Sequence, residues 1–328
     1  MRGMRDRCAR SAKPKRPKSR IPRMTLPFLP SRRRLLAPAL ALGAVAALSA
    51  CSPARLVNGL VPADTYRFEG GIAYGAAPRQ KLDLYRPLAG GTSGVLADGR
   101  KPPLVVFFYG GTWTHGDRAS FRFVGEALAA RGAMVAIPDY GLAPEFRYPV
   151  FVRDSALAVK WALDQAARLG ADPARVYVMG HSSGAYNAAM VALDGRWLGE
   201  LGARPNQLAG WIGMAGPYDF LPIENPQARV AFDWPATPAD SQPYAHAGSG
   251  APRTLLMAAG DDRTVDPRRN TARLAQRLRA AGVDVRTESF DDLGHVTLIG
   301  AMARPLRWIG GPVLPPVTEF LGLTRTKG

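Results

Sequence analysis

The stretch from Val176 to Ala185 constrains the possible fold more than any other part of the chain. It reads V-Y-V-M-G-H-S-S-G-A, so β-favouring residues meet a glycine-flanked turn and small residues at helical spacing follow directly. This pattern predicts a strand, a sharp turn and a helix. Glycines two residues before and two after Ser182 keep the strand and the helix from colliding, and the turn leaves the serine hydroxyl exposed at the sheet edge. Ser182 is therefore the candidate nucleophile.

Strand and helix patterns alternate on both sides of this turn. Apolar runs typical of buried strands lie at Leu104–Phe108, Met134–Ile137, Leu208–Met214 and Thr254–Ala258, and a last strand is expected at Val283–Phe290. Helical periodicity covers Phe121–Arg131, Val150–Leu169 and the segment with Leu274, Leu278 and Ala281. Two earlier runs, Tyr66–Tyr74 and Gln80–Tyr85, precede them, and the half-buried alternation of the second is typical of antiparallel strands entering a mixed sheet. Together these segments predict a three-layer α/β fold, with a mostly parallel central sheet and helices on both faces.

Residues 220–253 interrupt the alternation. The segment is broken by prolines and glycines but retains Phe232, Trp234 and Tyr244. An aromatic-bearing insert after a central strand favours a small cap over the site, and a disordered insert is the alternative.

Length and charge indicate one large domain behind a basic leader. The chain has 328 residues and a net charge of +17, but residues 1–50 hold 13 Lys and Arg against one acid. The remainder carries 30 basic and 25 acidic residues. Basicity therefore belongs to the leader, and no nucleic-acid partner is expected for the domain, which we assign to residues 63–328.

The leader resembles an export signal. Ser31-Arg32-Arg33-Arg34 precedes an apolar run from Leu35 to Ala50, whose 16 residues suit a signal peptide better than a bilayer span. The run ends in L-S-A-C, which resembles the lipobox of bacterial lipoproteins and implies that Cys51 is acylated. The resemblance would require an aspartate at position 52 for inner-membrane retention, so Ser52 favours an outer-membrane or other envelope destination. The alternative is a buried hydrophobic helix that ends in an incidental cysteine.

Within the leader, S-R-R-R-L-L weakly resembles a twin-arginine export signal. Met24 is an alternative start of translation, because a signal peptide of ordinary length would begin there. Cys8 and Cys51 are the only cysteines, so no disulfide, zinc site or cysteine nucleophile is expected in the mature domain. Residues 51–62 are expected to form a lipidated tether.

His295 is the candidate base for Ser182. A serine hydroxyl becomes a good nucleophile only when an imidazole removes its proton. The chain has four histidines. His181 adjoins the nucleophile and must point elsewhere, His115 lies in the loop after the strand at Leu104–Phe108, and His246 lies in the insert. His295, in the loop after the last strand, remains.

Asp262 is the candidate acid. A carboxylate is needed to fix the tautomer of the imidazole, and Asp262 lies two residues beyond Gly260 at a strand end. The chain order nucleophile, acid, histidine is that of hydrolases with an elbow serine. Asp261 and Asp266 stay as alternatives, each with the competing role of capping the helix that starts near Pro267.

From about Tyr66 to Leu321 the chain resembles an α/β-hydrolase of the hormone-sensitive-lipase type, close to bacterial carboxylesterases, feruloyl-esterase-like proteins and kynurenine formamidases. The matching motifs are L-D-L-Y-R-P, Y-G-G-T-W, D-Y-G-L-A-P-E, G-H-S-S-G-A and the G-D-D and G-H loops. The resemblance implies that the backbone N–H groups of Gly111, Thr112 and Ser183 stabilise an oxyanion. The family motif usually begins His-Gly-Gly, whereas this chain has Tyr109 there, and we expect its hydroxyl to brace the loop.

These observations predict a lipid-anchored envelope serine hydrolase, a carboxylesterase that acts on small to medium acyl groups. No metal or organic cofactor is implied. Arylformamidase or feruloyl-type aryl-esterase activity is the alternative among enzymes. A pseudo-hydrolase that serves as a binding or scaffold lipoprotein is the alternative of another class.

Overall fold

The computed structural model describes residues 57–88, 96, 99–307 and 311–323. The expected leader, the candidate lipidation site Cys51 and the first half of the tether lie outside these ranges, so they stay predictions, as do the domain boundaries. Within the described ranges, no helix combines the length and the apolar character that crossing a bilayer requires.

The centre of the domain is an eight-stranded sheet in the order β1-β2-β4-β3-β5-β6-β7-β8. The strands are β1 (Tyr66–Ala73), β2 (Lys81–Pro87), β3 (Leu104–Phe108), β4 (Met134–Pro138), β5 (Val176–His181), β6 (Gly210–Met214), β7 (Thr254–Ala259) and β8 (Val285–Phe290). β1 and β2 pair antiparallel with each other, β2 pairs antiparallel with β4, and the pairs from β4 to β8 are parallel. The expected mixed sheet with an antiparallel entry is confirmed.

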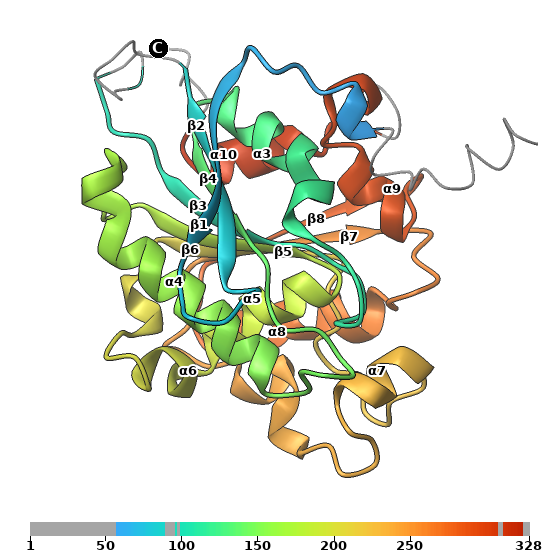
Figure 1. Cartoon of the computed structure of the whole chain (residues 1–328). Coiled ribbons are helices and arrows are strands. Elements are labelled where there is room, and N and C mark those ends of the chain that lie inside the picture. Colours follow the sequence, from blue (N-terminus) through green and yellow to red (C-terminus); the bar gives the residue numbers. More distant parts are fainter. Residues whose placement is uncertain (1–56, 89–95, 97–98, 308–310, 324–328) are drawn as a thin grey trace, which may run out of the picture. The chain divides into compact units, whose positions relative to one another are not determined.

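Helices cover both faces of this sheet (Figure 1). They are α3 (Arg122–Ala129), α4 (Val150–Leu169), α5 (Ser183–Leu193), α6 (Gly195–Gly199), α7 (Pro226–Ala231), α8 (Arg273–Ala280), α9 (His295–Gly300) and α10 (Leu314–Phe320). Every residue of β3, β4, β5, β6 and β7 is buried, as expected for strands covered on both sides. α4 has the predicted bounds and ends at Gly170, whose φ of 86° is the left-handed conformation that terminates helices.

Some element bounds differ from the sequence expectation for local reasons. α3 begins after a 3₁₀ turn at Arg118–Phe121 and ends before Gly132, whose φ is 103°. β8 begins two residues later than expected because the N–H of Val283 donates to the carbonyl of Leu278 and closes α8 instead of joining the sheet. Turn and cap hydrogen bonds therefore take residues that apolar periodicity alone assigns to the neighbouring element.

The strand order places two loops side by side at the carboxyl edge of the sheet. β3 lies between β4 and β5, so the chain crosses from one side of β3 to the other between these two strands. Ligands bind at such switch points in open α/β sheets. Phe108 at the end of β3 pairs with Gly180 of β5, which brings the glycine loop after β3 beside Ser182. The insert at residues 220–253, gold in Figure 1, contains α7 and two 3₁₀ turns, Ala239–Ser241 and Pro243–His246.

Candidate active site

Ser182 sits on a strained turn between β5 and α5. Its φ of 56° and ψ of −127° lie in a region that residues with a side chain rarely adopt. The flanking glycines are required sterically, because a Cβ on Gly180 would lie 2.1 Å from the carbonyl oxygen of Gly184. A Cβ on Gly184 would lie 2.1 Å from the carbonyl oxygen of Phe108. The sequence G-H-S-S-G therefore dictates a conformation in which the serine side chain leaves the turn at the sheet edge.

The structure brings together the serine, histidine and aspartate that the sequence selects. His295, the first residue of α9, lies with Nε2 2.7 Å from Ser182 Oγ and Nδ1 2.7 Å from Asp262 Oδ2. The side chain of Asp262 is 1% exposed and that of His295 is 11% exposed, so protein shields both from water. A carboxylate on Nδ1 fixes the proton there and leaves Nε2 free to accept the serine proton.

Asp262 is held in its ionised form. Burial raises the pKa of this carboxyl group, but hydrogen bonds from His295 and from the N–H groups of Val265 and Thr264 outweigh that effect and lower the pKa below its ordinary value. The two N–H groups donate to Asp262 Oδ1 at 2.8 and 2.9 Å, which leaves Oδ2 for the imidazole. An ionised carboxylate in this place stabilises an imidazolium.

The two alternative acids have other partners. Asp261 accepts a hydrogen bond from the guanidinium group of Arg263 at 3.1 Å. Asp266 Oδ1 accepts from the N–H of Arg268 at 2.8 Å, so it caps the turn that leads into α8, which is the competing role the sequence suggests. Neither carboxylate contacts His295 in the part of the chain that the structure describes.

His181 packs behind the catalytic candidate His295 and does not face the serine hydroxyl. Its Nε2 lies 2.9 Å from the backbone carbonyl oxygen of His295, and the centroids of the two rings are 5.0 Å apart. Burial, with a smaller contribution from the charge of His295, lowers the pKa of His181 to about 3. The ring is therefore neutral at physiological pH and donates to that carbonyl, which tethers the start of α9.

The glycine loop after β3 faces the nucleophile. A Cβ on Gly110 would lie 2.9 Å from the Cβ of Ser182, so only glycine permits this approach. Gly111 has a φ of 141° and Thr112 a φ of 52°. The N–H of His115 donates to the carbonyl of Gly111 and closes a tight turn in this loop. Ser183 is the first residue of α5, and the first N–H groups of a helix have no partner within it. The backbone donors that the family resemblance implies thus come from the glycine loop and from the residue that follows Ser182.

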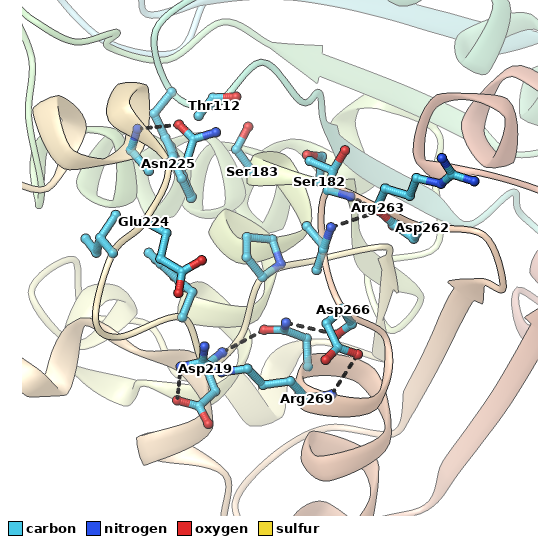
Figure 2. Close-up of a pocket in the computed structure, with 18 of the residues that line it drawn as sticks. Thr112, Ser182, Ser183, Asp219, Glu224, Asn225, Asp262, Arg263, Asp266 and Arg269 are labelled. Carbon is cyan, nitrogen blue, oxygen red and sulfur yellow. Dashed lines mark hydrogen bonds and ion pairs between the residues drawn. The ribbon is translucent and has the colours of Figure 1, made fainter.

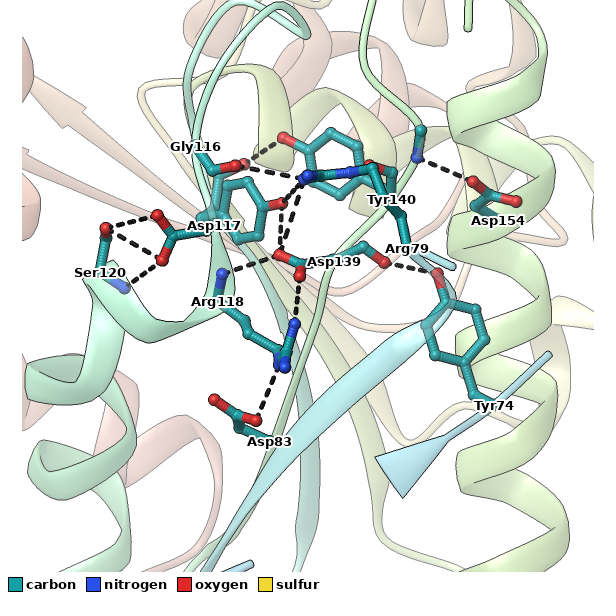
Figure 3. Close-up of polar contacts among 12 residues, drawn as sticks. Tyr74, Arg79, Asp83, Gly116, Asp117, Arg118, Ser120, Asp139, Tyr140 and Asp154 are labelled. Atoms are coloured by element: carbon teal, nitrogen blue, oxygen red, sulfur yellow. Dashed lines mark hydrogen bonds and ion pairs between the residues drawn. The ribbon is translucent and has the colours of Figure 1, made fainter. Parts of the chain in front are cut away.

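Tyr109, the residue that departs from the family pattern, anchors this loop in the polar network around Asp139, whose Arg79 and Arg118 are labelled in Figure 3. Its hydroxyl donates to Asp139 Oδ1 at 2.8 Å and accepts from the guanidinium group of Arg79 at 3.0 Å. Arg118 pairs with the same carboxylate of Asp139 and, at 2.8 Å, with Asp83. Burial, together with Tyr140 and Asp139, raises the pKa of Tyr109 well above its ordinary value, so the hydroxyl keeps its proton.

A cavity of about 310 Å³ opens beside Ser182 (Figure 2). Its walls come from the glycine loop, the elbow, the start of the insert and the loop after β7, with Trp113, Phe220, Ile223 and Val265 among the apolar lining residues. The first residues of the insert therefore line the site, as expected for a cap. Trp113 is fixed by a hydrogen bond from its indole N–H to Asn187 and stacks on Phe220 of the insert at 5.9 Å.

Several site residues carry no sequence signal of their own. Arg79 and Arg118 approach Asp139 from distant segments, and neither is marked by a motif. Asp139 belongs to D-Y-G-L-A-P-E, so the motif locates the residue but not its contact with Tyr109. Glu224 and Asn225 line the cavity from the insert, where periodicity is absent. Only the three-dimensional arrangement identifies Arg79, Arg118, Glu224 and Asn225 as residues of the site.

The chain is similar to known hydrolases and esterases. Residues 105–299, more than half of the chain, match the family described as alpha/beta hydrolase fold. Esterase LipC of Mycobacterium tuberculosis is 27% identical over 248 residues, which cover 70% of this chain and 58% of LipC. Isoprenylcysteine alpha-carbonyl methylesterase ICME of Arabidopsis thaliana is 34% identical over 156 residues, or 46% of this chain and 35% of ICME. The chain thus spans about a third of the plant relative's length and little more than half of LipC.

Solved structures share the fold at low sequence identity. A structure of esterase B from Lactobacillus rhamnosis with a tributyrin phosphonate has a TM-score of 0.66 and 18% identity, and the match covers 90% of this chain and 96% of that one. At this level of identity the likeness concerns the fold alone. The three-layer α/β prediction is therefore confirmed by independent structures.

Proposed function

Since the chain belongs to the alpha/beta hydrolase fold family, we propose that it is a serine hydrolase that cleaves carboxylic esters of small to medium acyl groups. The observation that carries this proposal is the continuous hydrogen-bonded line from Ser182 Oγ through His295 to Asp262, with both distances at 2.7 Å. Its relatives LipC and ICME are named as esterases, which agrees with the reaction class. The intact line also favours an enzyme over a binding protein that keeps only the fold.

The first half of the reaction makes an acyl-enzyme. Ser182 Oγ attacks the ester carbonyl carbon while its proton passes to His295 Nε2, and the carbonyl π electrons move onto oxygen. Asp262 stabilises the imidazolium that forms. The imidazolium then gives this proton to the alkoxy oxygen as the bond from carbonyl carbon to that oxygen breaks, and the alcohol leaves.

The second half returns the enzyme to its starting state. His295 Nε2 takes a proton from water, the resulting hydroxide attacks the acyl carbon, and the carboxylic acid leaves as Ser182 Oγ regains the proton. In both halves, negative charge develops on the carbonyl oxygen. The N–H groups of Gly111, Thr112 and Ser183 are proposed to stabilise it, since preorganised donors of this kind each contribute about 3 kcal/mol to transition-state stabilisation.

Replacement of the nucleophile tests the proposal. We expect Ser182→Ala to lower kcat for p-nitrophenyl butyrate at least about a thousandfold, because the remaining groups cannot form the acyl-enzyme. The thermal unfolding midpoint should not fall. Ser289→Ala, at an exposed serine on β8, is the matched control and should retain activity. Turnover by a folded Ser182→Ala protein close to that of the wild type would contradict the assignment.

We also propose that Cys51 attaches the protein to the bacterial envelope through lipid. The support is the L-S-A-C sequence at the end of the apolar run and the lack of another cysteine after it. Lasting attachment needs more than one acyl chain, since each buried CH₂ contributes about 0.8 kcal/mol. Mass spectrometry of the membrane fraction should find Cys51 acylated at the mature N-terminus. An unmodified Cys51 or another mature start would refute the anchor without affecting the catalytic proposal.

A further inference from the structure

The charged residues that line the cavity differ in how their charge is compensated. The lining includes Asp219, Glu224, Asp262 and Asp266 together with Arg263 and Arg269. Carboxylates therefore outnumber guanidinium groups at this site, although the chain as a whole is strongly basic. A substrate that itself carries a carboxylate would meet net repulsion here.

All but one of these groups have partners within the protein. Asp219 pairs with Arg273 at 2.5 Å, and Arg269 donates to the carbonyl of Leu221 and lies 4.0 Å from Asp219. Asp262 is bound to His295, and Asp266 caps the turn before α8. These interactions hold the insert and the loop after β7 in place, so these four charged groups already have partners within the protein.

Arg263 does not compensate the remaining carboxylate. Its side chain is 87% exposed and pairs with Asp261 at 3.1 Å. Figure 2 shows its guanidinium group directed away from the side of the cavity where Glu224 lies. Glu224 is exposed, and it has no hydrogen-bond or ion-pair partner among the described residues. Its carboxylate is turned toward the middle of the lining residues (Figure 2).

Apolar groups share the cavity with this free carboxylate. Phe220 and Pro222 line it from the same insert, and behind Phe220 the buried ring of Trp113 stacks on it at 5.9 Å. A carboxylate beside Phe220 and Pro222 matches a group that is cationic and also carries methyl or methylene groups, because the charge meets the carboxylate while the carbons pack on these two side chains. A sugar hydroxyl would gain the hydrogen bond but would leave the aromatic surface without an apolar partner.

We propose that the site prefers esters whose non-reacting end carries an alkylammonium group, and that Glu224 is the residue that selects it. This inference rests on the proposed esterase activity and specifies its substrate class. Glu224 belongs to the insert and lies across the cavity from Ser182, which sits on the turn between β5 and α5 (Figure 2). It is therefore placed to contact the far end of the substrate and not the ester bond. It is therefore a specificity residue and takes no part in the chemical step.

Matched substrates isolate the effect of the charge. On the acyl side, p-nitrophenyl 4-(trimethylammonio)butyrate is compared with p-nitrophenyl 5,5-dimethylhexanoate, in which carbon replaces the charged nitrogen. On the alcohol side, butyrylcholine is compared with 3,3-dimethylbutyl butyrate. The ratio of kcat/KM for the cationic and the neutral ester of each pair is measured with the full chain at low salt. Using both pairs shows which end of the ester enters the insert side of the cavity.

Glu224→Gln should lower this ratio about two- to fivefold in at least one pair, the range expected when one exposed ion pair is removed. The neutral esters should be hydrolysed as by the wild type, which also shows that the variant is folded. Glu69→Gln removes an equal charge from the edge strand β1, four strands away from β5 in the sheet, and should leave both ratios unchanged. Added salt should lower the wild-type ratio and not that of Glu224→Gln.

The outcomes separate the two proposals. Hydrolysis of the neutral esters with ratios that Glu224→Gln does not change in either pair would overturn the alkylammonium inference and leave the esterase proposal intact. Absence of wild-type hydrolysis of all four esters, together with an unreactive Ser182, would overturn the esterase proposal and the inference that rests on it.

Discussion

Replacement of Tyr109 by phenylalanine tests whether the polar network behind the glycine loop stabilises the domain. The change removes only a hydroxyl, which donates to Asp139 at 2.8 Å and accepts from Arg79 at 3.0 Å. Hydrogen bonds to charged groups contribute about 1.5–3 kcal/mol each. Asp139 keeps the N–H and the guanidinium group of Arg118, and the side chain of Arg79 is 34% exposed, so water replaces part of that second bond.

We therefore expect Tyr109→Phe to lower the free energy of unfolding by about 2 kcal/mol. In a domain of this size the thermal midpoint should fall by roughly 4–8 °C. Because the residue directly precedes Gly110 and Gly111, kcat should also fall, by about tenfold, with little change in KM. Urea titration and p-nitrophenyl butyrate kinetics measure the two effects.

The matched control is Tyr177→Phe. Tyr177 is buried at 5% exposure, but its hydroxyl has no hydrogen-bond partner among the described residues. Its removal should change stability by less than about 0.5 kcal/mol. The reasoning would be refuted if Tyr109→Phe were as stable and as active as the Tyr177→Phe control.

Four other substitutions test the elbow, the buried histidine and the acid. Gly184→Ala should cost at least about 3 kcal/mol of unfolding free energy or prevent folding, since its Cβ would lie 2.1 Å from a backbone carbonyl, and urea titration of a stable variant would contradict this. His181 is neutral when folded with a pKa of about 3, while the unfolded residue takes up a proton below about 6.5, so stability should fall on acidification through this window by up to about 5 kcal/mol. His181→Gln should flatten that profile, whereas an unchanged profile would disprove the assignment. Asp262→Asn should lower kcat about a thousandfold and Asp266→Asn less than tenfold, and the reverse order would make Asp266 the orienting acid.

The fold could be predicted because each of its elements has a local cause. The five strands that are buried on both faces have largely apolar sequences. The elbow requires glycine at positions 180 and 184 because a Cβ there would meet backbone atoms. Ser182, Asp262 and His295 follow from their positions after strand ends, since parallel strands deliver these loops to one edge. Bounds such as the start of β8 could not be predicted, because a cap hydrogen bond at Val283 competes with the sheet.

The supporting residues could not be predicted for a different reason. The contact between Arg79 and Tyr109 joins segments 30 residues apart in the chain, and nothing in either segment indicates the other. The carboxylate of Glu224 is unpaired among the described residues because the charged side chains around it have other partners, and only the folded arrangement reveals those partners. Sequence patterns thus locate the reacting groups, and packing determines what positions them and what they select.

The central claim is that Ser182 is an activated nucleophile, and labelling with a fluorophosphonate probe tests it most directly. The probe reacts only with a serine whose proton can be removed, so peptide mass spectrometry should place the adduct on Ser182. Labelling should be lost in Ser182→Ala and strongly reduced in Asp262→Asn. An adduct on another residue, or none on Ser182 in folded wild-type protein, would contradict the account.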